Sequence, residues 1–256
     1  MDSKLLIPIS IVVAAIVIAG ALFVVNKDDS PKVADNDNGS QQAAVDNSTS
    51  VRPISEDDHI LGNPNAKIII VEYSDTECPF CKKFHETMHQ VIDEYGKDGK
   101  VAWVYRHSPL VGLHSKAQKE AEATECAFDQ GGNVAFWEYT DRLYEITPSN
   151  NDLDLDQLPQ IAEDVGLSGE ELEECLDSER NAKKVQDDLA DASASGARGT
   201  PHNIMLVGDE EIDIPGAQPF TAMKVAIDMV LSESDAVNTE DTEDTEDTED
   251  TEDTEE

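Results

Sequence analysis

The sequence predicts an α/β domain with an inserted helical region, preceded by one transmembrane helix. Three observations carry this prediction. An uncharged run from Leu5 to Val25 stands near the N-terminus, a strand–helix–strand pattern spans about 67–105, and strands return at 203–214 after a long helical stretch. Because strand–helix–strand is the unit of a parallel pair joined by a crossover, we interpret the intervening helices as an insertion into one sheet-based domain.

The 256-residue chain is strongly acidic, with 56 Asp and Glu against 18 Lys and Arg, a formal charge of −38. Such a charge argues against nucleic acid and anionic lipid surfaces as partners. Residues 239–256 repeat Thr-Glu-Asp and hold 12 of the carboxylates. A repeat of this kind has no apolar face to bury, so we expect a disordered acidic tail over 234–256. The rest of the chain is acidic as well.

The apolar run Leu5–Val25, within an N-terminal segment over 1–25, matches the ~20 residues that a bilayer core requires. Ala19-Gly20-Ala21 resembles the cleavage site of a signal peptide, but Leu22–Val25 extends the apolar run beyond it. This favours an uncleaved signal-anchor, and Lys4 ahead of the span places the remainder outside the cytoplasm. We therefore expect a single-pass protein of the cell membrane, with a flexible polar linker over 26–54.

The folded domain is expected over 55–233. The apolar, β-branched run Ile68–Val71 is bounded by turn residues and predicts a buried strand. A helix follows, with apolar residues from Phe84 to Tyr95 at spacings of three and four, and then a second strand at Val101–Tyr105.

Helices are predicted throughout the insertion, about 108–197. Their ranges are 115–128, 133–146, 155–165, 168–176 and about 180–194. Two further strands, 203–208 and 211–214, are joined by a turn at Gly208-Asp209. A last amphipathic helix over about 220–231 is expected to pack on the sheet.

Cys78-Pro79-Phe80-Cys81 lies where the first strand meets the following helix. Two intervening residues place the second cysteine one turn above the first, close enough for a disulfide. At a helix N-terminus, free N–H groups and the helix dipole stabilise a thiolate on Cys78, and Pro79 suits the first turn. Half of a zinc site is the alternative, but Cys126 and Cys175 stand singly and far apart. The motif is typical of a thioredoxin-like redox site.

The motif and its surroundings resemble the DsbA-like branch of the thioredoxin superfamily, with its membrane-anchored, BdbD-like members. The resemblance covers about 57–231 and includes Leu61–Ala66, Val71–Asp75, Tyr105–Leu110 and Gly199-Thr200-Pro201. It implies a thioredoxin fold with a helical insertion, and a cis-proline at Pro201 that faces the cysteine pair.

The resemblance also implies residue roles. Cys78 is expected to be the exposed nucleophile and Cys81 the buried resolving partner. Glu72, on the strand beneath, would be a buried acid whose raised pKa lets it move the proton of Cys81, although an ordinary edge-strand glutamate is the alternative. Thr200 would pair with a bound peptide through its backbone, and Pro201 would shape the groove.

Two residues depart from the pattern of the family. Phe80 stands where strongly oxidising relatives have His, which predicts a milder oxidant. His202 follows the proline, either lining the substrate groove or occupying a surface turn. In the insertion, some relatives carry a second disulfide, which favours a Cys126–Cys175 bond over two separate buried cysteines.

No metal site or cofactor is expected. His85 and His89 are four residues apart on one helix, but no third ligand is in view, so we interpret them as surface or packing residues. No segment indicates a site for flavin, haem or nucleotide.

Together these features predict a monomeric, extracytoplasmic thiol–disulfide oxidoreductase that introduces disulfides into exported proteins with free cysteines. A quinone-linked membrane partner would reoxidise it. A disulfide reductase or isomerase, and a non-catalytic peptide-binding module, are the alternatives. The chain has no obvious dimerisation domain, which argues against a dimeric isomerase, and the reduction potential decides the direction of reaction.

Overall fold

The computed structural model describes residues 51–240. The predicted anchor over 1–25 and nearly all of the linker and of the Thr-Glu-Asp repeat lie outside the described residues. The tail predicted over 234–256 starts too early, because the last helix runs from Phe220 to Glu240 instead of ending near 231. Within 51–240, no helix combines the length and the apolar character needed to cross a bilayer.

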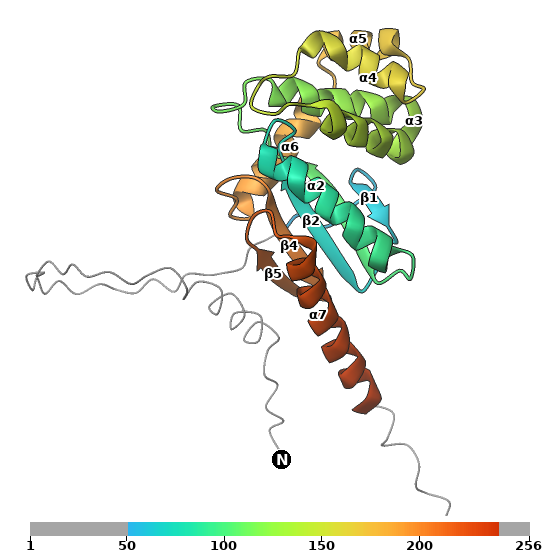
Figure 1. Cartoon of the computed structure of the whole chain (residues 1–256), viewed down its shortest axis with the longest axis vertical. Helices are drawn as coiled ribbons and strands as arrows, with labels where there is room; N and C mark the ends of the chain where they lie inside the picture. The colour runs from blue at the N-terminus through green and yellow to red at the C-terminus, as the bar shows by residue number, and fades with distance from the viewer. Residues whose placement is uncertain (1–50, 241–256) are drawn as a thin grey trace, which may run out of the picture.

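One mixed sheet of five strands organises the domain (Figure 1). The strands are β1 (His59–Gly62), β2 (Ile68–Ser74), β3 (Val101–His107), β4 (His202–Val207) and β5 (Glu210–Ile214). Their order across the sheet is β1-β3-β2-β4-β5, so β2 is central, parallel to β3 and antiparallel to β4. The predicted α/β fold is confirmed. Strand β1 was not predicted: it is a four-residue edge strand, antiparallel to β3.

Helices cover both faces of the sheet and extend beyond one end. They are α2 (Pro79–Val91), α3 (Ala117–Ile146), α4 (Leu158–Asp164), α5 (Gly169–Ser178), α6 (Ala182–Ala194) and α7 (Phe220–Glu240), with short turns η1 (Ile92–Gly96) and η2 (Leu155–Gln157). Helices α2 and α7 share one hydrophobic core with the sheet, and α6 packs on the opposite face. Helices α3, α4 and α5 stack together at one end of the molecule, as Figure 1 shows.

The two helices predicted at 115–128 and 133–146 form one element, α3, with a bend at Gly132. Gly132 has φ of 68°, a left-handed conformation that glycine adopts without steric penalty. Gly132 therefore separates two helical segments within α3, and the prediction of two helices with a break between them is confirmed.

Alternation along β2 determines which side chains meet the cysteine-bearing helix. Successive residues of a strand point to opposite faces. Ile68 and Ile70 belong to the core beneath α2, whereas Val71 and Tyr73 belong to the core beneath α6. Glu72 has the parity of Ile68 and Ile70, so its carboxyl group lies on the α2 side of the central strand.

The last residues of the predicted linker belong to the fold. Val51 is buried, and the Arg52 guanidinium forms ion pairs of 3.0 Å with both Asp58 and Asp188. The linker predicted over 26–54 therefore ends before Val51. The polar composition of the segment does not reveal this boundary. The two carboxylates that bind Arg52 lie outside the segment, and Asp188 is distant in sequence.

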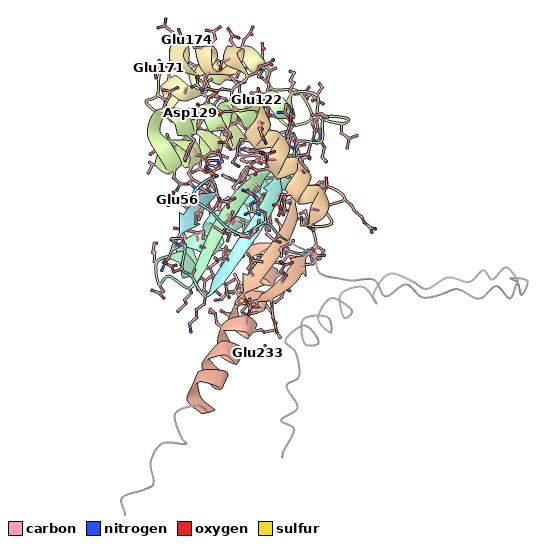
Figure 2. All side chains as sticks on the ribbon, turned by 180° about the vertical axis from the view of Figure 1, so that it is seen from behind. Glu56, Glu122, Asp129, Glu171, Glu174 and Glu233 are labelled. Carbon is pink, nitrogen blue, oxygen red and sulfur yellow. A yellow bond between two sulfur atoms is a disulfide. The ribbon has the colours of Figure 1, made fainter. Side chains whose placement is uncertain are left out.

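Acidic side chains lie on both the helical insertion and the sheet part of the described domain. Figure 2 shows Glu171 and Glu174 on α5, Glu56 beside the sheet and Glu233 on α7. The first three are exposed. The negative charge of the described domain is therefore shared between the helical insertion and the sheet part.

Candidate functional site

Cys78 is the N-cap residue of α2, with Pro79 at the first helical position. The thiol of Cys78 lies 3.5 Å from the carbonyl oxygen of Thr200. Cys78 was predicted to be exposed, but only 5% of its surface is, because the loop that carries Thr200 lies against it. Cys81 lies one turn further along α2, fully buried, and its sulfur accepts the backbone N–H of Asp75 at 3.4 Å. Both cysteines are thiols in this structure.

The two sulfurs have opposite electrostatic environments. A hydrogen bond from the Cys81 thiol, together with the backbone N–H groups of Cys81 and Phe80, lowers the pKa of Cys78 to about 6 and outweighs the effect of burial. Burial raises the pKa of Cys81 well above its ordinary value, and the hydrogen bond to Cys78 acts in the same direction. Near neutral pH the pair therefore holds one thiolate, on Cys78, and one thiol, on Cys81.

Glu72 is a fully buried carboxyl group on the α2 side of the sheet. Burial raises its pKa to about 8, although the hydroxyl of Ser74 donates a 2.7 Å hydrogen bond to Oε1. The indole N–H of Trp103 opposes the effect of burial as Ser74 does, while Oε2 has no partner at full hydrogen-bond geometry among the described protein atoms. Negative charge on Glu72 raises the pKa of Cys81, so the two groups lie close enough to influence each other. A protonated acid therefore lies beside the buried cysteine.

A chain of hydroxyl groups links this acid to the helical insertion. Ser74 Oγ lies 3.0 Å from the hydroxyl oxygen of Tyr144 on α3, and that hydroxyl lies 3.2 Å from the one on Tyr105 of β3. Ser74 and Tyr144 were not among the residues predicted from sequence. Nothing in their local pattern distinguishes them from ordinary core residues.

The segment that leads into Cys78 is held by several hydrogen bonds. Asp75 Oδ2 accepts the backbone N–H of Leu110 at 2.7 Å and lies 2.9 Å from His114 Nδ1. The carbonyl oxygen of Glu77 accepts the N–H of Asn150 at 2.8 Å. Loops from two distant parts of the chain therefore fix the approach to the cysteine pair.

The Thr200–Pro201 peptide bond is cis, and it faces the cysteine pair through the contact of Thr200 with Cys78. A cavity of about 580 Å³ adjoins it, lined in part by Thr200, Pro201 and His202. His202 is half-buried and lies 5.8 Å, centroid to centroid, from the ring of Tyr73. His202 thus lies beside the proline loop rather than in a free surface turn.

Phe80 projects into solvent beside this site, with 63% of its surface exposed. Cys126 on α3 and Cys175 on α5 lie apart from the redox pair and are joined by a disulfide within the helical insertion. The structure therefore brings Cys78, Cys81 and Glu72 together and leaves the second cysteine pair in a separate hydrophobic core.

The structure also supplies a partner that the spacing of His85 and His89 did not reveal. Asp141 Oδ1 on α3 lies 2.7 Å from Nε2 of His85 and 2.8 Å from Nε2 of His89. His85 is buried and His89 is half-buried. Asp141 is more than fifty residues away in sequence, and only the packing of α3 against α2 brings it to the pair.

Comparisons with known proteins agree with this geometry. A family model described as Thioredoxin matches residues 55–229. A curated relative, Na(+)/H(+) antiporter NhaA 3 of Salinispora tropica, is 33% identical over 167 residues, which are 64% of this chain and 23% of the relative. The matched part of the chain spans less than a quarter of the length of this relative and of two other NhaA antiporters.

Two solved structures match over most of their length. DsbA2 of Pseudomonas aeruginosa is 27% identical, with a TM-score of 0.56 over 68% of this chain and 94% of that one. Oxidised BdbD of Bacillus subtilis is 22% identical, with a TM-score of 0.63 over 72% and 97% of the two chains, and it supports the fold. The chain belongs to the thioredoxin family, and within it to the DsbA-like thiol–disulfide oxidoreductases.

Proposed function

We propose that this oxidoreductase introduces disulfides into exported proteins that carry free cysteines, by dithiol–disulfide exchange at Cys78 and Cys81. The observation that carries the proposal is the pKa of about 6 at Cys78, beside a Cys81 thiol whose pKa is well above its ordinary value. A stabilised Cys78 thiolate is a good leaving group and favours the reduced form of the enzyme, which makes the disulfide form an oxidant.

The proposed reaction moves two electrons from the substrate to the enzyme. A substrate thiolate attacks Sγ of Cys78 in the oxidised pair, the Cys78–Cys81 bond breaks, and a mixed disulfide forms. Cys81 leaves as a thiolate and takes the proton of Glu72, whose pKa of about 8 keeps it protonated at neutral pH. A second substrate thiolate then attacks the substrate sulfur of the mixed disulfide and expels the Cys78 thiolate.

The substrate would bind in the groove beside the cis-proline. An extended peptide can pair with the backbone of Thr200, while Pro201 and His202 shape the adjoining cavity. Phe80, being exposed, offers an apolar contact next to the reactive sulfur. Because Phe80 carries no positive charge, it stabilises the thiolate less than a cationic His would, so we expect an oxidant of moderate strength.

Turnover requires an oxidant that regenerates the Cys78–Cys81 disulfide, and a quinone-linked membrane partner has the required chemistry. The same proposal places residues 1–25 in the membrane as a signal-anchor, the domain over 51–240 on the extracytoplasmic side and the Thr-Glu-Asp repeat that follows as an acidic tail. The chain would act as a monomer. A DsbA-type domain in an oxidising compartment is consistent with the second disulfide.

Two assays test the direction of reaction. The purified protein is equilibrated with glutathione redox buffers to obtain its reduction potential, and its oxidation of a reduced, unfolded substrate is compared with its reduction of insulin. We expect a potential more oxidising than that of thioredoxin, about −270 mV, and faster substrate oxidation than insulin reduction. A potential at or below that value indicates a reductase instead. If the wild type shows no more of either activity than Cys78→Ser does, the domain is a non-catalytic binding module.

Phe80→His provides a matched variant at the same site. It restores a ring that can be cationic without changing either cysteine, so the potential is expected to rise. An unchanged or lower potential contradicts the role assigned to Phe80 and leaves the role of the cysteines standing.

A further inference from the structure

His85, His89 and Asp141 form a compact group of three ligand-type side chains outside the redox site. The Nε2 atoms of the two histidines are 3.2 Å apart, and Oδ1 of Asp141 lies 2.7 Å and 2.8 Å from them. The same carboxylate oxygen of Asp141 contacts both ring nitrogens, and the nitrogens lie close to each other. The three ligand atoms therefore form a small triangle that faces one common point. Such a convergence is compatible with a metal site or with a hydrogen-bonded network, and the surroundings of the group decide between the two.

The spacing of these atoms suits a small divalent ion. Zn²⁺ binds imidazole nitrogen and carboxylate oxygen at about 2.0–2.2 Å, which places neighbouring ligands of a tetrahedral site about 3.3 Å apart. The nitrogens already have this separation, and the carboxylate has to move outward by only about half an ångström. Histidines four residues apart on α2 face the same side of the helix, and α3 supplies the third ligand.

The surroundings are preorganised on one side and open on the other. The ring of His85 is buried and lies 4.5 Å from that of Tyr144 and 5.0 Å from that of Trp103, centroid to centroid. The side chain of His89 is 36% exposed and that of Asp141 is 44% exposed. A rigid ligand at the back and two accessible ones at the front leave a route for an ion and for water.

The cavity in front of the group is negatively charged. It has a volume of about 850 Å³ and its lining includes the carboxylates of Glu86, Glu138, Glu145 and Asp164. Its two cations are already engaged. Lys82 donates to the carbonyl oxygens of Glu145 and Thr147, and Arg142 pairs with Glu145 and Asp164. Five carboxylates, Asp141 included, stand against two cations in this lining, so net negative charge surrounds the point where the three ligands converge.

A second group, His59, His107 and Glu125, shows by contrast what an internal network looks like. Both ring nitrogens lie 2.8 Å from Glu125 Oε1, but all three residues are buried. The ammonium group of Lys184 lies 3.8 Å from the same carboxylate oxygen. A cation already faces this group and no open side admits another, so we assign it a structural role.

We propose that His85, His89 and Asp141 bind one divalent transition-metal ion of the Zn²⁺ type, with the remaining coordination positions filled by water or a cavity carboxylate. The ion would join the cysteine-bearing helix α2 to helix α3 of the insertion. The combination of two imidazoles and one carboxylate favours Zn²⁺ over Ca²⁺ or Mg²⁺, which prefer oxygen ligands alone.

The test is a Zn²⁺ titration of the full chain by isothermal titration calorimetry, with Cys78 and Cys81 oxidised so that their thiols bind no metal. Excess Mg²⁺ suppresses diffuse binding to the acidic surface and tail. We expect one Zn²⁺ per chain in the wild type, and an affinity reduced at least tenfold in His89→Gln and in Asp141→Asn. Both positions are partly exposed, so these variants should fold, which near-ultraviolet circular dichroism checks.

Matched controls separate this site from others. Asp209→Asn removes an exposed carboxylate in the turn between β4 and β5, and His202→Gln removes a histidine elsewhere; both should bind Zn²⁺ as the wild type does. Visible absorption of bound Co²⁺ gives an independent signature that should disappear in Asp141→Asn. The proposal is overturned if the wild type binds no stoichiometric Zn²⁺. It is also overturned if His89→Gln and Asp141→Asn bind normally, including the case in which only His107→Gln abolishes binding.

Discussion

Replacing Glu72 by glutamine should change how the stability of the protein depends on pH. Burial raises the pKa of Glu72 to about 8 from an ordinary value of 4.5. Between these values the native carboxyl group keeps its proton while the unfolded one is ionised. The unfolded state therefore binds fewer protons, and the free energy of unfolding of the wild type falls as pH rises. Glu72→Gln removes this dependence because glutamine does not titrate.

The size of the effect follows from the separation of the two pKa values. Each pH unit in this window is worth about 1.4 kcal/mol, so the difference in stability between the variant and the wild type should change by about 4 kcal/mol from pH 5 to pH 8. In the variant, the NH₂ group of glutamine takes the place of Oε2, which has no partner at full hydrogen-bond geometry in the described domain. Burying this donor without an acceptor destabilises the variant by about 1–3 kcal/mol at every pH. The variant should therefore be the less stable protein at pH 5 and the more stable one at pH 8.

Urea-induced unfolding followed by tryptophan fluorescence measures this difference, because Trp103 and Trp137 are both buried in the domain. The oxidised protein is used throughout, so that no cysteine titrates. Glu56→Gln, which changes an exposed carboxylate, serves as the control and should track the wild type at every pH. If the Glu72→Gln difference varies by less than about 1 kcal/mol between pH 5 and pH 8, Glu72 is not a buried, protonated acid and cannot supply the proton for Cys81.

Three further predictions test other parts of the structure. Alkylation of the reduced protein at Cys78 should follow a titration with a midpoint near pH 6, since the pKa of Cys78 is lowered to about 6, and a midpoint above 8 would contradict the thiolate assignment. Removing the disulfide between Cys126 and Cys175, which are separated by 49 positions, with both residues changed to alanine, should lower the free energy of unfolding by roughly 4 kcal/mol; a loss below about 1 kcal/mol refutes the stabilising role. Arg106→Met should cost roughly 3–5 kcal/mol in denaturant unfolding, because the buried Arg106 pairs with Asp58 at 2.8 Å and the carboxylates around it would lose their main cation; a near-neutral result would show that the network relaxes.

The central part of the fold could be predicted because its signals are local. The run Ile68–Val71 is apolar and β-branched, the cysteine motif begins a helix, and Val101–Tyr105 is another apolar run. These became β2, α2 and β3 with small changes at their ends. Short-range patterns of this kind depend only on burial and on the geometry of each element.

The parts that could not be predicted depend on long-range packing. Strand β1 has four residues at an edge of the sheet and too little alternation to identify it. The buried Arg106, with Asp58 on one side and Asp191 on the other, joins three segments separated by more than forty residues. Asp141 belongs in the same class, since its relation to His89 exists only after α3 has packed against α2.

These long-range contacts indicate that the helical insertion takes part in the redox site and is more than an attached domain. Tyr144 of α3 contacts Ser74, and Ser74 donates to Glu72, the acid beside Cys81. His85 is one turn beyond Cys81 on α2, and Asp141 holds it from α3. A rigid shift of α3 would therefore alter both the hydrogen bonding of the buried acid and the position of the cysteine-bearing helix. Negative charge on this acid adds to the effect of burial in raising the pKa of Cys81, so the packing of the insertion can influence the electrostatics of the pair.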